Sequence, residues 1–209
     1  MARSKSTSRR WMDRHLNDPW VQKAQLDGYR SRASYKLLEI IEKDRLLPRN
    51  ATVIDLGAAP GGWSQVVMRK LAGRGRVIAL DLLPMEPLGD VEFIQGDFRQ
   101  QQVLDDLLTR LQGQHADLVM SDMAPNLSGI KAVDQPAMVL LLELALELAQ
   151  LTLKPGGNML VKVFEGAGMA EYRRQLALCF GRVVMRKPAA SRDSSAEQYL
   201  LAMDFNGSI

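Results

Sequence analysis

Acidic side chains stand at the ends of several apolar runs in this 209-residue sequence. Their positions are Asp55, Asp81, Asp97 and Asp122. Because ligands of open α/β sheets bind beyond the carboxyl ends of the strands, we expect these acids to surround one ligand. A carboxylate accepts hydrogen bonds, so Asp81 suits ribose hydroxyls and Asp97 suits an adenine amine. Any single acid could instead cap the following helix, but four acids around one turn favour a binding site.

A glycine-rich turn follows the first apolar run. Residues 57–62 read Gly-Ala-Ala-Pro-Gly-Gly, and a helical pattern comes next. Glycines allow a ligand to approach the backbone closely, but this spacing differs from the G-x-G-x-x-G turn that binds a dinucleotide pyrophosphate. The turn therefore predicts an adenosyl ligand without phosphates, such as S-adenosylmethionine, and argues against an NAD-dependent dehydrogenase. Trp63 follows the glycines at once and is a candidate contact, although packing in the core is the alternative.

Lys162 lies inside an apolar run, between Val161 and Val163. A buried and unpaired ammonium in a central strand would cost several kcal/mol. One interpretation is that the ammonium reaches water at the end of the sheet. The other places it at the mouth of the site beside Asp122, which makes Lys162 a candidate catalytic residue.

The elements that must position these residues alternate along the chain. Two helices are predicted first, one from about Asp18 and one from Ser31 to Leu46. After them, strands are predicted at 52–56, 76–81, 91–95, 116–121, 158–164, 181–187 and 197–203, and helices at 62–72, 101–112, 135–153 and 169–179. Because several strands are continuously apolar, this alternation predicts an α/β fold, with a mostly parallel seven-stranded sheet and helices on both faces.

The last two strands break the alternation. The connection from Arg186 and Lys187 to Tyr199 is polar and too short for a helical crossover. We therefore expect a C-terminal antiparallel hairpin, which gives the layout of Rossmann-like methyltransferases.

Composition limits the class of protein. Apolar residues make up 46% of the chain and charged residues 24%, as in an ordinary single globular domain. We expect no secretory signal, because the N-terminus is polar and basic without an apolar core. We expect no membrane span, because Glu143 and Glu147 interrupt the most apolar segment, which is also too short. The single cysteine, Cys179, fits a reducing cytoplasm. With His15 and His115 as the only histidines, we expect no metal site.

Positive charge is concentrated near the N-terminus. Residues 1–36 hold nine Lys or Arg residues against three Asp residues, while the remainder is slightly acidic. A basic arm on a nearly neutral body suggests contact with a phosphate backbone, and a solvated tail is the alternative. Residues 1–10, which are rich in Ser, Arg and Lys, are expected to be mobile.

Three motifs carry a resemblance to a known family. They are DLGAAPGGWSQ at 55–65, SDMAPN at 121–126 and LVKVF at 160–164. Together they resemble the ribosomal RNA 2′-O-ribose methyltransferases of the RrmJ (FtsJ) type, and the likeness extends from Ser31 to Glu197.

The resemblance implies S-adenosylmethionine-dependent methyl transfer to the ribose 2′-hydroxyl of a uridine in 23S rRNA of the large (50S) ribosomal subunit. It places the family's catalytic Lys-Asp-Lys-Glu tetrad on Lys36, Asp122, Lys162 and Glu197. It places the cofactor contacts on Gly61, Trp63, Asp81, Asp97 and Asp122. We also expect a cytoplasmic monomer, with residues 1–30 as a basic, partly flexible RNA-contacting segment and 31–209 as the catalytic domain.

Methyl transfer to a hydroxyl requires that the oxygen be aligned with the methyl group and that its proton be handled. In this hypothesis Lys162 either takes the proton as a neutral amine or stabilises the developing alkoxide as an ammonium, and the sequence leaves both roles open. Asp122 would orient Lys162, while Lys36 and Glu197 would hold the ribose. The RNA would be held by the basic residues from Arg3 to Lys36, with Arg30 and Arg32 near the catalytic Lys36, helped by Arg186, Lys187 and Arg192.

Two rival functions remain beside this one. Amino-methyltransferases that act on a base usually carry Asn/Asp-Pro-Pro-aromatic after the fourth strand, whereas the run from Asp122 to Pro125 lacks the aromatic residue. A non-catalytic RNA-binding protein on a methyltransferase fold is disfavoured by the complete apparent tetrad.

Overall fold

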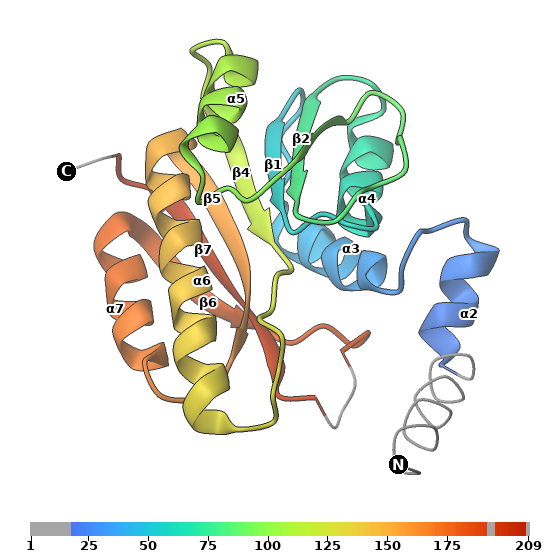
Figure 1. Ribbon diagram of the computed structural model, residues 1–209. Coiled ribbons are helices and arrows are strands. Elements are labelled where there is room, and N and C mark those ends of the chain that lie inside the picture. The colour runs from blue at the N-terminus through green and yellow to red at the C-terminus, as the bar shows by residue number, and fades with distance from the viewer. Residues whose placement is uncertain (1–17, 192–194, 208–209) are drawn as a thin grey trace.

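The computed structural model describes residues 18–191 and 195–207. Seven strands form one sheet in the order β3-β2-β1-β4-β5-β7-β6, with helices on both faces (Figure 1). Basic residues that the sequence assigned to RNA at positions 3–14 and 192 lie outside the described residues.

Strands β1 to β5 run parallel, and only β7 is reversed, because it pairs antiparallel with both β5 and β6. The predicted α/β fold with a C-terminal antiparallel hairpin is therefore confirmed. Their bounds are β1 Thr52–Leu56, β2 Arg76–Asp81, β3 Glu92–Gln95, β4 Ala116–Ser121, β5 Leu153–Phe164, β6 Phe180–Arg186 and β7 Glu197–Phe205. Central strands such as β1 are buried along their whole length, which explains their uninterrupted apolar sequence.

Two hydrophobic cores lie on opposite faces of the sheet. Apolar residues of α3 and α4 pack on one face, and those of α5, α6 and α7 pack on the other (Figure 1). The helices of the described chain are α2 Pro19–Leu26, α3 Ala33–Asp44, α4 Gly62–Leu71, α5 Gln101–Leu111, α6 Lys131–Thr152 and α7 Met169–Cys179. Because side chains alternate along a strand, central strands such as β1, β4 and β5 supply both cores.

Helix α2 packs outside the α3–α4 layer. The Asp18 carboxylate caps α2 by accepting a hydrogen bond from the backbone N–H of Trp20, at 3.0 Å. The connection that follows α2 is tied to α4, because Arg69 donates to the carbonyl oxygens of Asp27 and Gly28. The residues that follow α2 are therefore docked against α4.

Two elements begin earlier than the sequence predicts. Helix α6 starts at Lys131 and contains Pro136, whose missing N–H costs one helical hydrogen bond near the helix start. The Asp134 carboxylate offsets this cost by accepting hydrogen bonds from Ser128 and Gly129. Strand β5 starts at Leu153, which pairs with β4 before the register shifts across the Lys-Pro-Gly-Gly run. That run has the composition of a turn, which is why the prediction began after it.

Within the described residues, no helix is both long enough and apolar enough to span a membrane.

Candidate active site

The carboxyl ends of β1, β2, β3 and β4 border one open cleft of about 640 Å³. It lies where the strand order reverses between β1 and β4, which is where open α/β sheets bind ligands. Asp81, Asp97 and Asp122 line this cleft together with Gly57 and apolar residues of α6. The structure thus brings three of the four strand-end acids together in the lining of one cleft.

The fourth acid, Asp55, lies beneath the glycine turn in a smaller adjoining cavity of about 170 Å³. Its side chain is fully buried and accepts a hydrogen bond from the Ser64 hydroxyl at 2.7 Å. Burial raises the pKa of Asp55 to about 7, and the Asp122 charge adds to the rise while the Ser64 hydrogen bond opposes it.

The glycine turn needs its glycines for two different reasons. Gly57 has φ +72°, and a Cβ there would lie 2.3 Å from Cγ of Met123. Gly61, with φ +98°, is the residue from which α4 begins. These positions keep the turn close to the neighbouring loops and leave its backbone open to a ligand.

Asp81 and Asp97 present carboxylate oxygens to the cleft while holding nearby backbone. Asp81 accepts hydrogen bonds from the N–H groups of Ala59 and Leu83, each at 2.8 Å. Asp97 pairs with the Arg99 guanidinium, whose hydrogen bonds lower the pKa of that carboxyl despite some burial. The capping interpretation therefore describes part of what each residue does, and ligand contact stays a prediction.

The hydrogen-bond acceptors that line the cleft fit an adenosyl cofactor. Carboxylates suit the ribose hydroxyls, the adenine amine and a positively charged methionyl group. Among the described residues that line the cleft, Arg99 is the only cation, and it is already paired with Asp97. A phosphate-bearing dinucleotide would meet mainly negative charge here, which agrees with the spacing of the glycine turn.

Trp63 serves the core in this structure. Its side chain is buried, its Nε1–H donates to the carbonyl oxygen of Ala33 at 2.9 Å, and its ring lies 5.6 Å from that of Tyr199. Trp63 also lines the smaller cavity next to Asp55 and Asp122, so cofactor contact remains a prediction for it.

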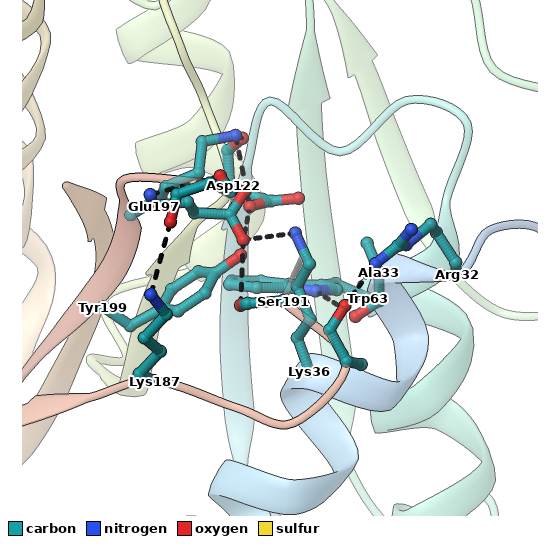
Figure 2. A network of polar contacts seen from close by, with 12 residues as sticks. Arg32, Ala33, Lys36, Trp63, Asp122, Lys187, Ser191, Glu197 and Tyr199 are labelled. Atoms are coloured by element: carbon teal, nitrogen blue, oxygen red, sulfur yellow. Dashed lines mark hydrogen bonds and ion pairs between the residues drawn. The ribbon is translucent and has the colours of Figure 1, made fainter. Parts of the chain in front are cut away.

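The four predicted tetrad residues form two lysine–carboxylate pairs near the C-terminal ends of β4 and β5. Figure 2 shows three of them, Lys36, Asp122 and Glu197, close to one another. The Lys36 ammonium on α3 lies 2.5 Å from Oε1 of Glu197 on β7. The Lys162 ammonium on β5 lies 3.3 Å from Oδ1 of Asp122 and donates to the Asp122 carbonyl oxygen. Both lysine side chains are about one-tenth exposed. Burial of an unpaired ammonium group would be destabilising, and the carboxylate partners offset that cost.

Tyr199 joins the two pairs, and sequence reasoning did not identify it. Its ring is fully buried, and its hydroxyl donates to Oδ1 of Asp122 at 2.8 Å. Burial raises the pKa of Tyr199 well above its usual value, and the charges of Asp122 and Glu197 raise it further. Strand alternation could have pointed to Tyr199, because a residue two positions after Glu197 in a strand lies on the same face. The structure adds that Tyr199 lies opposite Lys162 in the strand register.

Glu197 is held in its charged form by its neighbours. Burial raises the pKa of Glu197, but the Lys36 and Lys162 ammonium groups and a hydrogen bond from Ser191 outweigh that effect and hold it below the usual value. The cluster therefore presents an ionised carboxylate and a lysine side by side, and Asp122 of the cluster also lines the cleft.

Three arginines that the sequence assigned to RNA are engaged within the protein. Arg30 donates to backbone carbonyl oxygens at the cleft, and Arg32 pairs with Asp18. Arg186 forms two hydrogen bonds with the Asp44 carboxylate, at 2.8 and 2.6 Å. Positive charge in the sequence did not reveal that these side chains have internal partners.

The chain is similar to known methyltransferases. The family model of FtsJ-like methyltransferases matches residues 29–205. A ribosomal RNA large subunit methyltransferase E from Pseudomonas aeruginosa is 57% identical over 207 residues, which cover 99% of this chain and 100% of that protein. The protein of the same name from Pseudomonas fluorescens is also 57% identical over 207 residues, with 99% of each chain covered.

Solved structures agree with the fold. A ribosomal RNA methyltransferase from Plasmodium falciparum is 30% identical, with a TM-score of 0.77 over 86% of this chain and 100% of that one. Human methyltransferase-like protein 13, solved in complex with SAH, is 13% identical, with a TM-score of 0.57 over 81% of this chain and 82% of that one, and supports the fold alone.

The family match spans every strand of the sheet, the glycine turn and both lysine–carboxylate pairs. The relatives at 57% identity extend that likeness to nearly the full chain. This chain belongs to the FtsJ-like methyltransferase family.

Proposed function

We propose that this protein transfers the methyl group of S-adenosylmethionine to the ribose 2′-oxygen of a uridine in 23S rRNA, acting on the large (50S) ribosomal subunit in the cytoplasm as a monomer. The observation that carries the proposal is the cluster of two lysine–carboxylate pairs beside a carboxylate-lined cleft. The names of the two Pseudomonas relatives support a large-subunit ribosomal RNA as the substrate.

The cofactor would occupy the 640 Å³ cleft, with Asp81 accepting from its ribose hydroxyls and Asp97 from its adenine amine. Asp122 would face its positive charge, and Trp63, which lines the smaller adjoining cavity, would border it. Gly61 lines neither cavity, and it would act from the start of α4 by keeping the glycine turn open to the cofactor. When bound, S-adenosylmethionine supplies a methyl group whose bond to sulfur breaks with the electron pair left on the sulfur.

Lys162 would assist the attacking ribose oxygen. As a neutral amine it accepts the 2′-hydroxyl proton, and as an ammonium it stabilises negative charge on the oxygen while the proton passes to water. Asp122 holds Lys162 through its carbonyl oxygen and its carboxylate. Lys36 and Glu197 offer one donor and one acceptor for the other ribose oxygens, which would fix the alignment of the hydroxyl.

RNA affinity would come from exposed cations on the surface of the protein. Lys23 on α2, Lys43 on α3 and Lys187 after β6 have exposed side chains. Phosphate contacts of this kind give affinity without sequence information. The segment 1–30 would contribute to the same basic surface, with 31–209 as the catalytic domain. Because the reacting group is the 2′-hydroxyl, DNA is excluded as a substrate.

The proposal is tested by incubating the protein with methyl-labelled S-adenosylmethionine and either large ribosomal subunits or free rRNA, then digesting the RNA to nucleosides. We expect the label in 2′-O-methyluridine. Label on a base would overturn the 2′-oxygen as the acceptor, and no label with either RNA, despite cofactor binding, would favour a non-catalytic RNA-binding protein.

Lys162→Ala tests the residue assignment. Loss of a positioned proton-transfer group lowers rates by about 100-fold or more, so we expect at least that loss with binding of S-adenosylhomocysteine retained. Lys70→Ala is the matched control, since Lys70 is an exposed lysine of α4 paired with Glu42. Equal activity of Lys162→Ala and Lys70→Ala would refute the assignment. In the parent, a rate that rises with pH identifies the amine as base, and a rate that falls identifies the ammonium.

A further inference from the structure

Two loops that border the cofactor cleft meet at the side chain of Arg30. One is the glycine turn, where Nη1 of Arg30 donates to the carbonyl oxygen of Pro60 at 3.1 Å. The other is the loop after β2, where the same guanidinium donates to the carbonyl oxygens of Glu86 and Pro87, at 2.7 and 2.6 Å. A single side chain therefore bridges three backbone carbonyl groups from two loops.

The loop after β2 has little secondary structure of its own. Neither helix nor strand is assigned to residues 82–91, although Leu82 and Leu83 line the cleft. This loop follows Asp81, whose carboxylate bonds the glycine turn at Ala59 and its own loop at Leu83. Arg30 and Asp81 thus hold the same two loops together.

Arg30 is itself fixed in place. Its backbone N–H donates to Oε1 of Gln65 on α4, at 2.9 Å, and Gln65 in turn donates to the carbonyl oxygen of Gly28. A Cβ on Gly61 would come within 3.0 Å of Nη1 of Arg30, so the turn passes directly against the guanidinium. A planar guanidinium has five donors in a fixed fork, and a lysine ammonium does not reproduce that geometry.

We propose that Arg30 is a positioning residue of the cofactor cleft, which clamps the glycine turn to the loop after β2, and is not an RNA phosphate ligand. The inference rests on the proposed function, since it takes the cleft to be the cofactor site. Carbonyl oxygens from both loops compete with any phosphate for the guanidinium. These oxygens belong to the same chain as Arg30, so a phosphate would have to displace intramolecular partners. Loss of the clamp would loosen the wall that carries Asp81.

The test measures binding of S-adenosylhomocysteine by titration calorimetry in the absence of RNA, for the parent, Arg30→Ala, Arg30→Lys and Arg32→Ala. Losing hydrogen bonds from a charged donor predicts a Kd that rises about tenfold in Arg30→Ala. Arg30→Lys keeps the charge without the fork and should show most of that loss. Arg32→Ala removes the same charge two residues away, from a side chain that bonds Asp18 and Ala190, and should leave the Kd unchanged.

Hydrogen exchange without any ligand gives a second readout. We expect faster amide exchange at residues 57–62 and 82–91 in Arg30→Ala and parent-like exchange in the sheet, which also shows that the variant is folded. A parent protein that fails to bind S-adenosylhomocysteine refutes the proposed function, while the exchange data still test the clamp. Unchanged exchange in these two loops would refute the clamp.

Filter binding of rRNA over a salt series distinguishes the alternative. A phosphate ligand lost to alanine reduces the salt slope by about one and leaves cofactor affinity intact. That result for Arg30→Ala, or full recovery of cofactor affinity in Arg30→Lys, would overturn the proposal. An unchanged salt slope with weakened cofactor binding supports it.

Discussion

Replacement of Asp55 by Asn should change the free energy of unfolding, relative to the parent protein, more favourably at alkaline pH than at acidic pH. Asp55 is buried beneath the glycine turn, where a Ser64 hydroxyl donates to it. Asn has the same shape and keeps an oxygen that can accept this hydrogen bond. The substitution therefore removes a buried charge without creating a cavity.

The magnitude follows from the two pKa values of the carboxyl group. Burial raises the pKa of Asp55 from 3.8 to about 7 in the folded protein. The folded state then binds the proton more tightly than the unfolded state, so stability falls as pH rises from about 4 to about 7. A difference of about three pH units corresponds to about 4 kcal/mol, of which about 2 to 3 kcal/mol appears between pH 5 and pH 8.5.

Urea unfolding of the parent and of Asp55→Asn at pH 5 and pH 8.5 measures this effect. The difference in unfolding free energy between the two proteins should shift in favour of Asn by roughly 2 kcal/mol across that interval. Titrating groups that do not interact with Asp55 are present in both proteins and cancel in the comparison, whereas Asp122 and Asp81 are coupled to it and contribute smaller changes. A difference that is the same at both pH values would show that the Asp55 carboxyl titrates normally and would refute the reasoning.

Two further predictions concern the glycine turn and an internal ion pair. Gly57→Ala adds a Cβ 2.3 Å from Cγ of Met123 and should weaken S-adenosylhomocysteine binding in calorimetry. Gly73→Ala is the control and should not weaken binding, because Gly73 has a similar φ of +76° with open space around it. Equal affinities of the two variants would contradict this prediction. Arg186→Met breaks the pair with Asp44, in which both side chains are largely buried, and should lower the free energy of unfolding by about 3 kcal/mol with unchanged rRNA affinity. Unchanged stability with weaker rRNA binding would instead restore Arg186 to the RNA surface.

The sequence by itself determined the layers of the fold and the place of the cleft at the carboxyl ends of the strands. Continuous apolar strands separated by amphipathic helices require a covered parallel sheet, and the short polar connection before β7 requires a reversal. The strand-end acids follow from that topology, because parallel strands bring their carboxyl ends to one edge. The two early starts, at Lys131 and Leu153, escaped prediction because Pro136 and the Lys-Pro-Gly-Gly run are local turn signals that tertiary pairing overrides.

Only the tertiary structure decided which side chains meet. Lys36 and Glu197 are 161 residues apart and pair because β7 inserts between β5 and β6, which no local pattern specifies. The same register sets Tyr199 opposite Lys162, and so gives the cluster its buried phenol. From the sequence, Arg30 is expected to bind RNA, yet its guanidinium donates to backbone carbonyl oxygens of the protein. Charge is a property of one residue, whereas the partner that satisfies it depends on how distant segments pack.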